Sequence, residues 1–254
     1  MLSRDWLPAD LAALQAPLGF DGSIAVQAQQ TVAETDWLLS LADQDPRIRG
    51  VVGWVDLQHD RVEDDLARLS RHPRLVGIRH VVQDEPDDRF MLRPAFQRGI
   101  SRLSAFSLRY DILIYPKQLP AALELVRAFP EQPFVLDHIA KPFIRTGTLS
   151  PWRGQIQELA QHPNVLCKVS GMVTEADHHN WKADDFNPFL DVVFEAFGVG
   201  RLMFGSDWPV CLLAASYPRV VELLESYVRT HARLKPSEVE GLWGLNAARF
   251  YGLQ

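Results

Sequence analysis

The chain has 254 residues, of which 47% are hydrophobic and 23% are charged, and this composition excludes a disordered chain, a coiled coil and a small disulfide-rich protein. Lysine and arginine number 26 against 32 aspartate and glutamate residues, which gives a formal net charge of -6. These charges are spread along the chain. The balance therefore argues against a surface that binds nucleic acid or an anionic membrane.

Cysteine content and hydropathy set further expectations. The two cysteines, Cys167 and Cys211, form no CxxC pair and indicate a reducing compartment without a structural disulfide. No apolar stretch reaches the roughly 18 residues of a membrane span, and the first residues lack the pattern of a signal peptide. No linker or low-complexity tract divides the chain. We therefore expect one cytoplasmic domain, residues 1–254, with homo-oligomerisation left open.

The predicted elements begin with a helix at residues 8–16. Seven short segments rich in apolar and β-branched residues follow, and amphipathic helical patterns separate them. The segments are residues 23–27, 50–56, 75–81, 111–116, 134–138, 165–171 and 202–207. They recur about every 30 residues, which is the length of a βαβ unit, so the pattern predicts a parallel sheet.

Two parallel-sheet architectures are compatible with this alternation. The closed (β/α)8 barrel needs about 250 residues, which matches the chain. The open doubly wound sheet is disfavoured because the sequence has neither G-x-G-x-x-G nor G-x-x-x-x-G-K-[ST]. We therefore predict a TIM (β/α)8 barrel. It has seven predicted strands and starts with a helix, so we expect its first strand to lie upstream, since two unpaired edges suit a soluble barrel poorly.

Polar side chains stand at the predicted strand ends, where parallel barrels carry their chemistry. Strand alternation predicts that Lys168 and Ser170 point into the barrel, and that His138 shares a face with Phe134 and Leu136. Any one of these polar residues is as well explained by solvation or capping, but together they favour a site. The full set is Gln27, Asp56, Arg79, His80, Tyr115, His138, Lys168, Ser170 and Asp207.

Five sequence segments resemble the amidohydrolase superfamily. They are 75–80 (LVGIRH), 136–142 (LDHIAKP), 167–171 (CKVSG), 204–210 (FGSDWPV) and 246–251 (NAARFY). Within the superfamily they are similar to the amidohydrolase-2 group, in the branch of sugar-lactone and pyrone-dicarboxylate lactone hydrolases that includes fuconolactonase-like and rhamnonolactonase-like enzymes. The resemblance implies that Asp207 activates the attacking water, that His138 ends the family's sixth strand, and that Arg79 holds a substrate oxygen.

The resemblance also bears on metal binding. In metal-using members a His-x-His motif on the first strand, a further histidine and the final aspartate hold zinc. Only His138 and Asp207 match this set, and they are too few for a four-coordinate site. We therefore assign no metal site, keep these two as weak candidates, and expect a zinc cofactor only if an upstream His-x-His exists. The adjacent His178 and His179 are interpreted as exposed loop residues.

The preferred functional hypothesis is a hydrolase that opens a sugar-acid lactone or a related cyclic ester. Asp207 takes a proton from water, and the resulting hydroxide attacks the lactone carbonyl. Arg79, His138 and Lys168 are the candidates to stabilise the developing oxyanion. Further candidates for substrate binding are Tyr115, Arg93, Gln27 and Trp208.

Two alternatives stay open at this stage. One is a zinc-dependent decarboxylase of the same superfamily, which stoichiometric zinc and release of carbon dioxide from an aromatic or muconate acid would favour. The other is an inactive barrel that serves as a binding module, which an upstream His-x-His would disfavour. The identity of the substrate depends on loop contacts that sequence patterns do not define.

Overall fold

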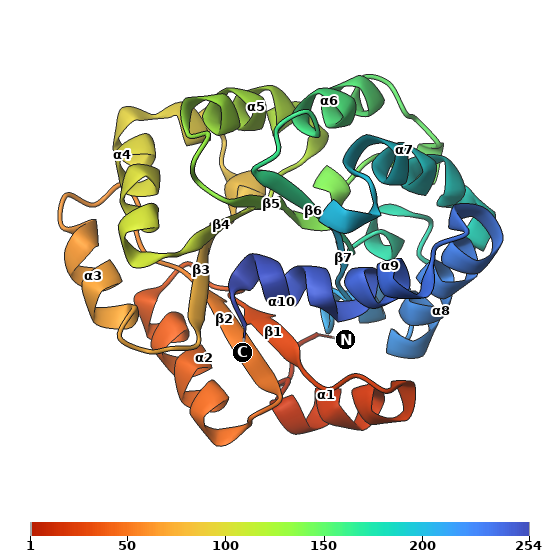
Figure 1. Ribbon diagram of the computed structural model, residues 1–254, viewed down its shortest axis with the longest axis horizontal. Coiled ribbons are helices and arrows are strands. Elements are labelled where there is room, and N and C mark those ends of the chain that lie inside the picture. Colours follow the sequence, from red (N-terminus) through yellow and green to blue (C-terminus); the bar gives the residue numbers. More distant parts are fainter. Residues whose placement is uncertain (1, 254) are drawn as a thin grey trace.

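A curled sheet of seven parallel strands forms the centre of the computed structural model, which describes residues 2–253 (Figure 1). Each strand pairs with the next one in the chain, so the spatial order equals the sequence order. This confirms the predicted parallel sheet. Residues 1 and 254, the ends of the expected domain, lie outside the described residues. The strands are β1 (Ser23–Val26), β2 (Ile48–Gly53), β3 (Leu75–His80), β4 (Arg109–Ile112), β5 (Phe134–Leu136), β6 (Val165–Val169) and β7 (Leu202–Phe204).

Helices surround this sheet, and α10 crosses the middle of the ring in Figure 1. Several begin with proline in their first turn, where the missing backbone N–H is not needed. None of the helices within residues 2–253 is long and apolar enough to cross a membrane. The helices are α1 (Pro8–Gln15), α2 (Val32–Gln44), α3 (Val62–Leu69), α4 (Pro94–Leu103), α5 (Leu119–Ala128), α6 (Trp152–Leu159), α7 (Asn187–Phe197), α8 (Tyr217–Tyr227), α9 (Pro236–Glu240) and α10 (Asn246–Tyr251).

The sheet buries apolar side chains on both of its faces. A large core lies between its outer face and the helices, and a smaller cluster lies on its inner face. In the smaller cluster, Phe250 and Tyr251 of α10 pack with the inward side chains of β2, β3, β5 and β7. Arg109, the first residue of β4, donates a 2.6 Å hydrogen bond from Nε to the Phe250 carbonyl. Helix α10 therefore covers the sheet where the strands begin.

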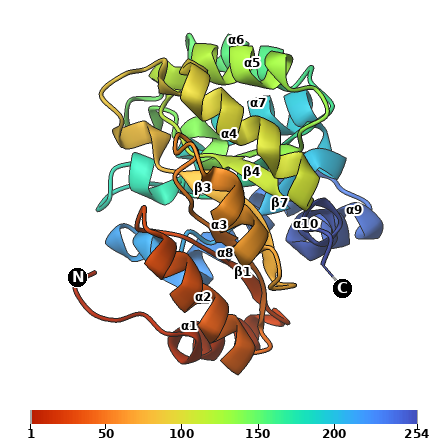
Figure 2. The same ribbon diagram turned by 90° about the vertical axis from the view of Figure 1, so that its left-hand side faces the viewer.

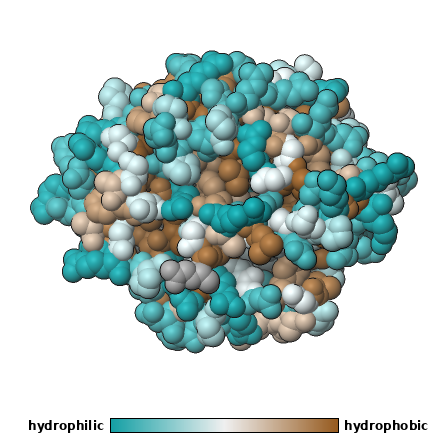
Figure 3. Space-filling model, in the orientation of Figure 1, coloured by the Kyte–Doolittle hydropathy of each residue, from teal (hydrophilic) through white to brown (hydrophobic). Residues whose placement is uncertain are grey.

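The same arrangement is visible on the molecular surface. Hydrophilic residues cover most of the periphery of the face that carries α10, and hydrophobic residues gather toward its centre (Figure 3). The side view shows α10 and the C-terminal end on one side of the sheet and the N-terminal end on the other (Figure 2). The carboxyl ends of the strands, where sites of parallel barrels lie, are thus at the end away from α10.

Strands β1 and β7 are the outer strands of the hydrogen-bonded sheet within residues 2–253. Side chains connect the two ends of the sheet: Phe20, just before β1, stacks on Phe204 of β7 with ring centroids 5.6 Å apart. Trp243 packs against both rings, at 6.0 and 4.6 Å. Aromatic packing therefore holds these two ends together.

Several predicted strands extend beyond the observed ends. The segment 134–138 is a strand only to Leu136, and the segment 202–207 only to Phe204. In both cases the last residue of the predicted segment adopts a left-handed backbone, with φ of 53° at His138 and 54° at Asp207. The alternation rule does not apply past such a turn, so the prediction that His138 shares a face with Phe134 and Leu136 was wrong. Asp137 is the residue that points inward there.

Gly99 in α4 permits a close approach to the backbone of the β2–α3 loop. A Cβ atom at this position would lie 2.1 Å from the Leu57 carbonyl oxygen. We expect Gly99→Ala to lower the free energy of unfolding by about 1–3 kcal/mol or more, because helix α4 must shift to make room for the Cβ atom. The control is Gly154→Ala in α6, where a Cβ meets nothing within 4 Å. It should stabilise the helix by up to about 1 kcal/mol. Urea unfolding measures both, and equal effects would contradict the packing argument.

Candidate active site

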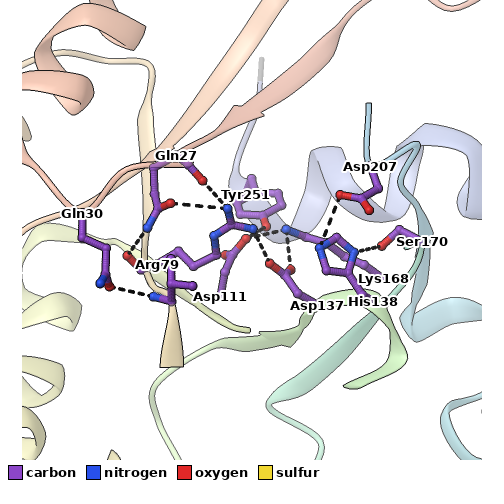
Figure 4. A network of polar contacts seen from close by, with 11 residues as sticks. Gln27, Gln30, Arg79, Asp111, Asp137, His138, Lys168, Ser170, Asp207 and Tyr251 are labelled. Carbon is purple, nitrogen blue, oxygen red and sulfur yellow. Dashed lines mark hydrogen bonds and ion pairs between the residues drawn. The ribbon is translucent and has the colours of Figure 1, made fainter. Parts of the chain in front are cut away.

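Four charged side chains form a buried network inside the curled sheet (Figure 4). The ammonium of Lys168 on β6 lies 2.5 Å from Asp111 Oδ2 and 2.8 Å from Asp137 Oδ1. The guanidinium of Arg79 on β3 pairs with Asp137 Oδ2 at 2.9 Å. Both carboxylate side chains are fully buried, and both cations are 11% exposed. The two positive and two negative charges balance, which is the condition for burying them.

Neighbouring groups add further hydrogen bonds to this network. Tyr251 of α10 donates its hydroxyl to Asp111 Oδ2 at 2.8 Å, the oxygen that also binds Lys168. Gln27, directly after β1, accepts from Arg79 through its backbone carbonyl. Its side-chain amide donates in turn to the Arg79 carbonyl at 3.1 Å. The network thus links β1, β3, β4, β6 and the C-terminal helix.

The two aspartates differ in their electrostatic surroundings. Burial raises the pKa of Asp111 to about 6, and Lys168 opposes this shift. Burial also raises the pKa of Asp137, but Lys168 and Arg79 outweigh burial and hold that pKa below its ordinary value. Burial lowers the pKa of Lys168, and the two carboxylates outweigh that effect, so its pKa is raised. Lys168 is therefore charged, and Asp137 is the firmly ionised carboxylate.

The chain leaves β5 through a left-handed turn. His138, Ile139, Ala140 and Lys141 all have φ between 48° and 59°. Left-handed backbone costs roughly 1–2 kcal/mol per non-glycine residue, and a β-branched isoleucine is unusual there. Two hydrogen bonds hold the turn: Lys141 N–H donates to the His138 carbonyl at 2.7 Å, and Trp152 Nε1 donates to the Ile139 carbonyl at 2.8 Å. Such strain is concentrated at functional sites.

The turn directs His138 toward the ends of β6 and β7. Its Nδ1 lies 2.8 Å from the hydroxyl of Ser170, and its Nε2 lies 3.7 Å from Asp207 Oδ1. Gly171 makes room for the ring, since a Cβ there would lie 2.7 Å from His138 Cγ. The imidazole is buried, and burial lowers its pKa although Asp207 opposes the shift. The ring is therefore neutral near pH 7, and it lies beside the Asp207 carboxylate at the carboxyl ends of the strands.

Comparisons with known proteins identify the family of this chain. The family model described as Amidohydrolase matches residues 1–253. This chain belongs to the amidohydrolase family. It is 43% identical over 263 residues to the L-fucono-1,5-lactonase of Burkholderia multivorans, covering 100% of this chain and 88% of that protein. It is 38% identical over 249 residues to the L-fucono-1,5-lactonase of Burkholderia ambifaria, covering 98% and 86%.

One solved structure resembles this amidohydrolase throughout. A crystal structure of an amidohydrolase from Burkholderia multivorans with bound zinc has a TM-score of 0.95 and 42% sequence identity. The match covers 100% of this chain and 90% of that one. The likeness extends across the whole seven-stranded sheet and its helices, so this chain has the amidohydrolase fold.

A zinc ion like the one in that relative would need several donor side chains in this amidohydrolase. His138 Nε2 and Asp207 Oδ1 are close enough to bind one cation together. Zinc in proteins takes about four ligands. Between residues 2 and 253, however, no group of three or more His, Cys, Asp or Glu side chains is arranged to hold a metal ion. The described residues therefore supply half of such a site and do not fit a complete one.

The other candidates from the sequence each contact a different neighbour. Tyr115, three residues after β4, has its ring 5.3 Å from the ammonium of Lys141. Trp208 follows Asp207 and packs edge-on against Trp6 with ring centroids 5.1 Å apart. Arg93 pairs with Asp87 at 3.0 Å outside the network.

Three other histidines of this amidohydrolase lie in different surroundings. His80 lies on the opposite side of β3 from Arg79, where it stacks on Phe90 and its Nε2 lies 2.7 Å from Glu85. His178 and His179 are exposed. They border a cavity of about 400 Å³ whose other lining residues are Arg145, Thr174, Glu175, Ala176 and Asp177. A more open groove of about 730 Å³ lies between α2 and α3, on the outer helix layer.

Sequence reasoning missed three members of the buried network. Asp111 lies within β4 and Asp137 directly follows β5, and their alternation with Tyr110, Ile112 and Leu136 was a usable signal for inward carboxylates. Tyr251 belongs to the terminal NAARFY segment, and nothing local in that segment indicates that it reaches Asp111. The predicted inward direction of Lys168 and Ser170 is confirmed, because both side chains contact partners on the inner side of the sheet.

Removing the central cation should strongly destabilise the folded protein. In Lys168→Met two buried carboxylates lose their shared partner, so we expect the free energy of unfolding to fall by about 3–5 kcal/mol. Chemical denaturation measures the change. Lys117→Met is the matched control, since Lys117 pairs with Asp88 at 2.7 Å with a side chain that is 52% exposed. Its effect should stay within about 1 kcal/mol. Similar losses in both variants would contradict a special role for Lys168.

The shift of Asp111 predicts a pH dependence with a definite sign. The pKa of Asp111 is about 6 in the folded protein, against an ordinary value of 3.8. Between these two pH values the folded state therefore binds this proton more tightly than the unfolded state does. The contribution of Asp111 to stability therefore falls as pH rises from about 4 to 6. The unfolding free energy of wild type minus that of Asp111→Asn should decrease across this window. Denaturation at several pH values measures it, and an increasing difference would contradict the assignment.

Proposed function

We propose that this amidohydrolase opens a lactone of a sugar acid by attack of a water molecule that Asp207 activates. The observation that carries the proposal is the position of the Asp207 carboxylate 3.7 Å from Nε2 of a neutral, buried His138. His138 follows β5 and Asp207 follows β7, the two strands that pair with β6. The two lactonases of Burkholderia at 43% and 38% identity support the substrate class. The same pair of groups suits hydrolysis of an ester carbonyl.

The proposed reaction uses the two groups in complementary roles. Asp207 takes a proton from water while the water oxygen bonds to the lactone carbonyl carbon. When the Ser170 hydroxyl donates to His138 Nδ1, the ring proton lies on Nε2, which can then donate to the carbonyl oxygen as it becomes negative. The tetrahedral intermediate expels the ring oxygen, which takes the proton from Asp207. The product is the open hydroxy acid.

Arg79 and Lys168 have a supporting role in this proposal. Their side chains are 11% exposed and bind the two buried aspartates, so they hold the strands beneath the site in position. Gln27 holds Arg79 in place, and Tyr115 and Trp208 remain the candidates to contact the substrate ring. Arg93 would reach a substrate only by leaving Asp87. The mechanism has no step through a metal ion.

We also propose that the curled sheet represents seven strands of a (β/α)8 barrel. The sequential parallel order supports this, as does the location of the polar groups at the carboxyl ends of the strands. The aromatic contact between Phe20 and Phe204 brings the two outer strands toward closure. The decarboxylase and binding-module alternatives have no contact in the described structure that favours them.

Substitution of the proposed base tests the mechanism. Asp207→Asn should lower kcat for L-fucono-1,5-lactone by about a thousandfold, and His138→Gln by about ten- to a hundredfold, since the amides keep the shape but not the proton transfer. Acid release followed in a weakly buffered solution measures both rates. The control is His72→Gln, because His72 pairs with Asp43 at 3.1 Å on the outer helix layer. It should leave kcat/KM unchanged.

Two outcomes would count against the proposal. The first is a wild-type protein that opens neither this lactone nor other six-membered aldonolactones. The second is an Asp207→Asn variant that keeps wild-type kcat, because no other described carboxylate lies as close to His138 Nε2.

A further inference from the structure

The left-handed turn after β5 delivers a second side chain besides His138. Lys141 is three residues further on, and its N–H bonds the His138 carbonyl, so one strained turn fixes both residues. The mechanism proposed above does not use Lys141. The backbone position of Lys141 is therefore fixed, and its ammonium faces a defined set of groups.

Lys141 faces an acceptor and an aromatic ring. Its Nζ lies 4.0 Å from Glu175 Oε1 and 5.3 Å from the centroid of the Tyr115 ring. The side chains of Lys141 and Glu175 are 15% and 22% exposed, so both are mostly enclosed yet accessible. A separation of 4.0 Å exceeds a hydrogen bond. The ammonium and the carboxylate therefore keep hydrogen-bonding capacity for a ligand that enters between them.

These groups stand on segments that also position the reacting pair: Lys141 shares the turn of His138, and Glu175 follows Ser170, which contacts His138 at the end of β6. Glu175 ends the short helical turn Val173–Glu175 that follows β6, and it borders the cavity of about 400 Å³. Burial raises the pKa of Glu175, the charge of Lys141 opposes this shift, and the charge of Asp207 adds to it. Burial likewise lowers the pKa of His138, and the charge of Lys141 adds to that shift. Glu175 therefore interacts electrostatically with Asp207, and Lys141 interacts electrostatically with His138.

We propose that Lys141 and Glu175, together with the ring face of Tyr115, bind the hydroxyl groups of the substrate and determine which hydroxylated lactone is opened. This rests on the proposed function. The ammonium donates to hydroxyl oxygens and the carboxylate accepts from hydroxyl hydrogens, so a diol can bridge the two. The aromatic face packs against the C–H groups of the ring. These contacts exist equally in ground state and transition state, so they act on KM.

Kinetics of two variants test the subsite. Lys141→Met keeps an unbranched side chain, one atom shorter, and removes its charge, and Glu175→Gln keeps the shape of the acceptor. Each should raise KM for L-fucono-1,5-lactone about tenfold or more and leave kcat within about threefold, as expected for a lost charge-assisted hydrogen bond. Lys141→Arg should recover part of the loss. Lys117→Met, whose lysine pairs with Asp88, is the matched control and should change neither constant.

Binding of the product separates this proposal from the proposed function. Titration calorimetry measures the affinity of the sugar acid, L-fuconate, for wild type, Lys141→Met and Glu175→Gln, and needs no turnover. Both variants should bind about tenfold more weakly or worse. If wild type opens no lactone but binds the acid through Lys141, the proposed function fails and the subsite stands.

The subsite itself is overturned by either of two results. One is a lactone that is opened with unchanged KM by both variants. The other is an acid that binds to the variants as tightly as to wild type. Thermal unfolding identifies a variant that does not fold. If Lys141→Met is such a variant, Glu175→Gln and Lys141→Arg decide the matter.

Discussion

The pairing of Lys168 with two buried carboxylates is the interaction on which the rest of the molecule depends. Lys168 reaches Asp111 on β4 and Asp137 after β5, and Asp137 in turn binds Arg79 on β3. Charges in so enclosed a place are tolerated only when each has a partner. The strands that bring these partners together must keep their register, so the network and the sheet specify each other. The proposed reaction centre stands on this floor.

A second constraint is the left-handed turn that follows. It follows the end of the strand at Leu136 and carries His138 and Lys141 to the open end, whereas Asp137 points inward by strand alternation. A regular strand would place alternate residues on opposite faces and could not present both side chains to one mouth. The unfavourable backbone is offset by the Trp152 hydrogen bond and by complete burial of Ile139 and Ala140. The positions that the turn gives to His138 and Lys141, and not their residue types alone, bring both side chains to the proposed site.

The parallel sheet, its seven strands and the inward direction of Lys168 and Ser170 were predictable, because periodicity and strand alternation are local properties of the sequence. The direction of His138 was not, since it depends on a turn that residues with side chains rarely adopt. Tyr251 was also beyond reach, because its partner Asp111 is 140 residues away in the sequence. The aromatic contact between Phe20 and Phe204 is of the same long-range kind. Local patterns define elements, and only the assembled fold defines which elements meet.

The contact between Tyr251 and Asp111 has a consequence for biosynthesis. On the ribosome the strands emerge one after another, with β4 and β6 well ahead of α10. Throughout that time the inner apolar side chains lack Phe250 and Tyr251, and Asp111 lacks one of its two donors. The strands can pair as they appear, but the interior is finished only after residue 251 has left the exit tunnel. The nascent sheet must therefore pass through a stage in which its interior is open to water and to other chains.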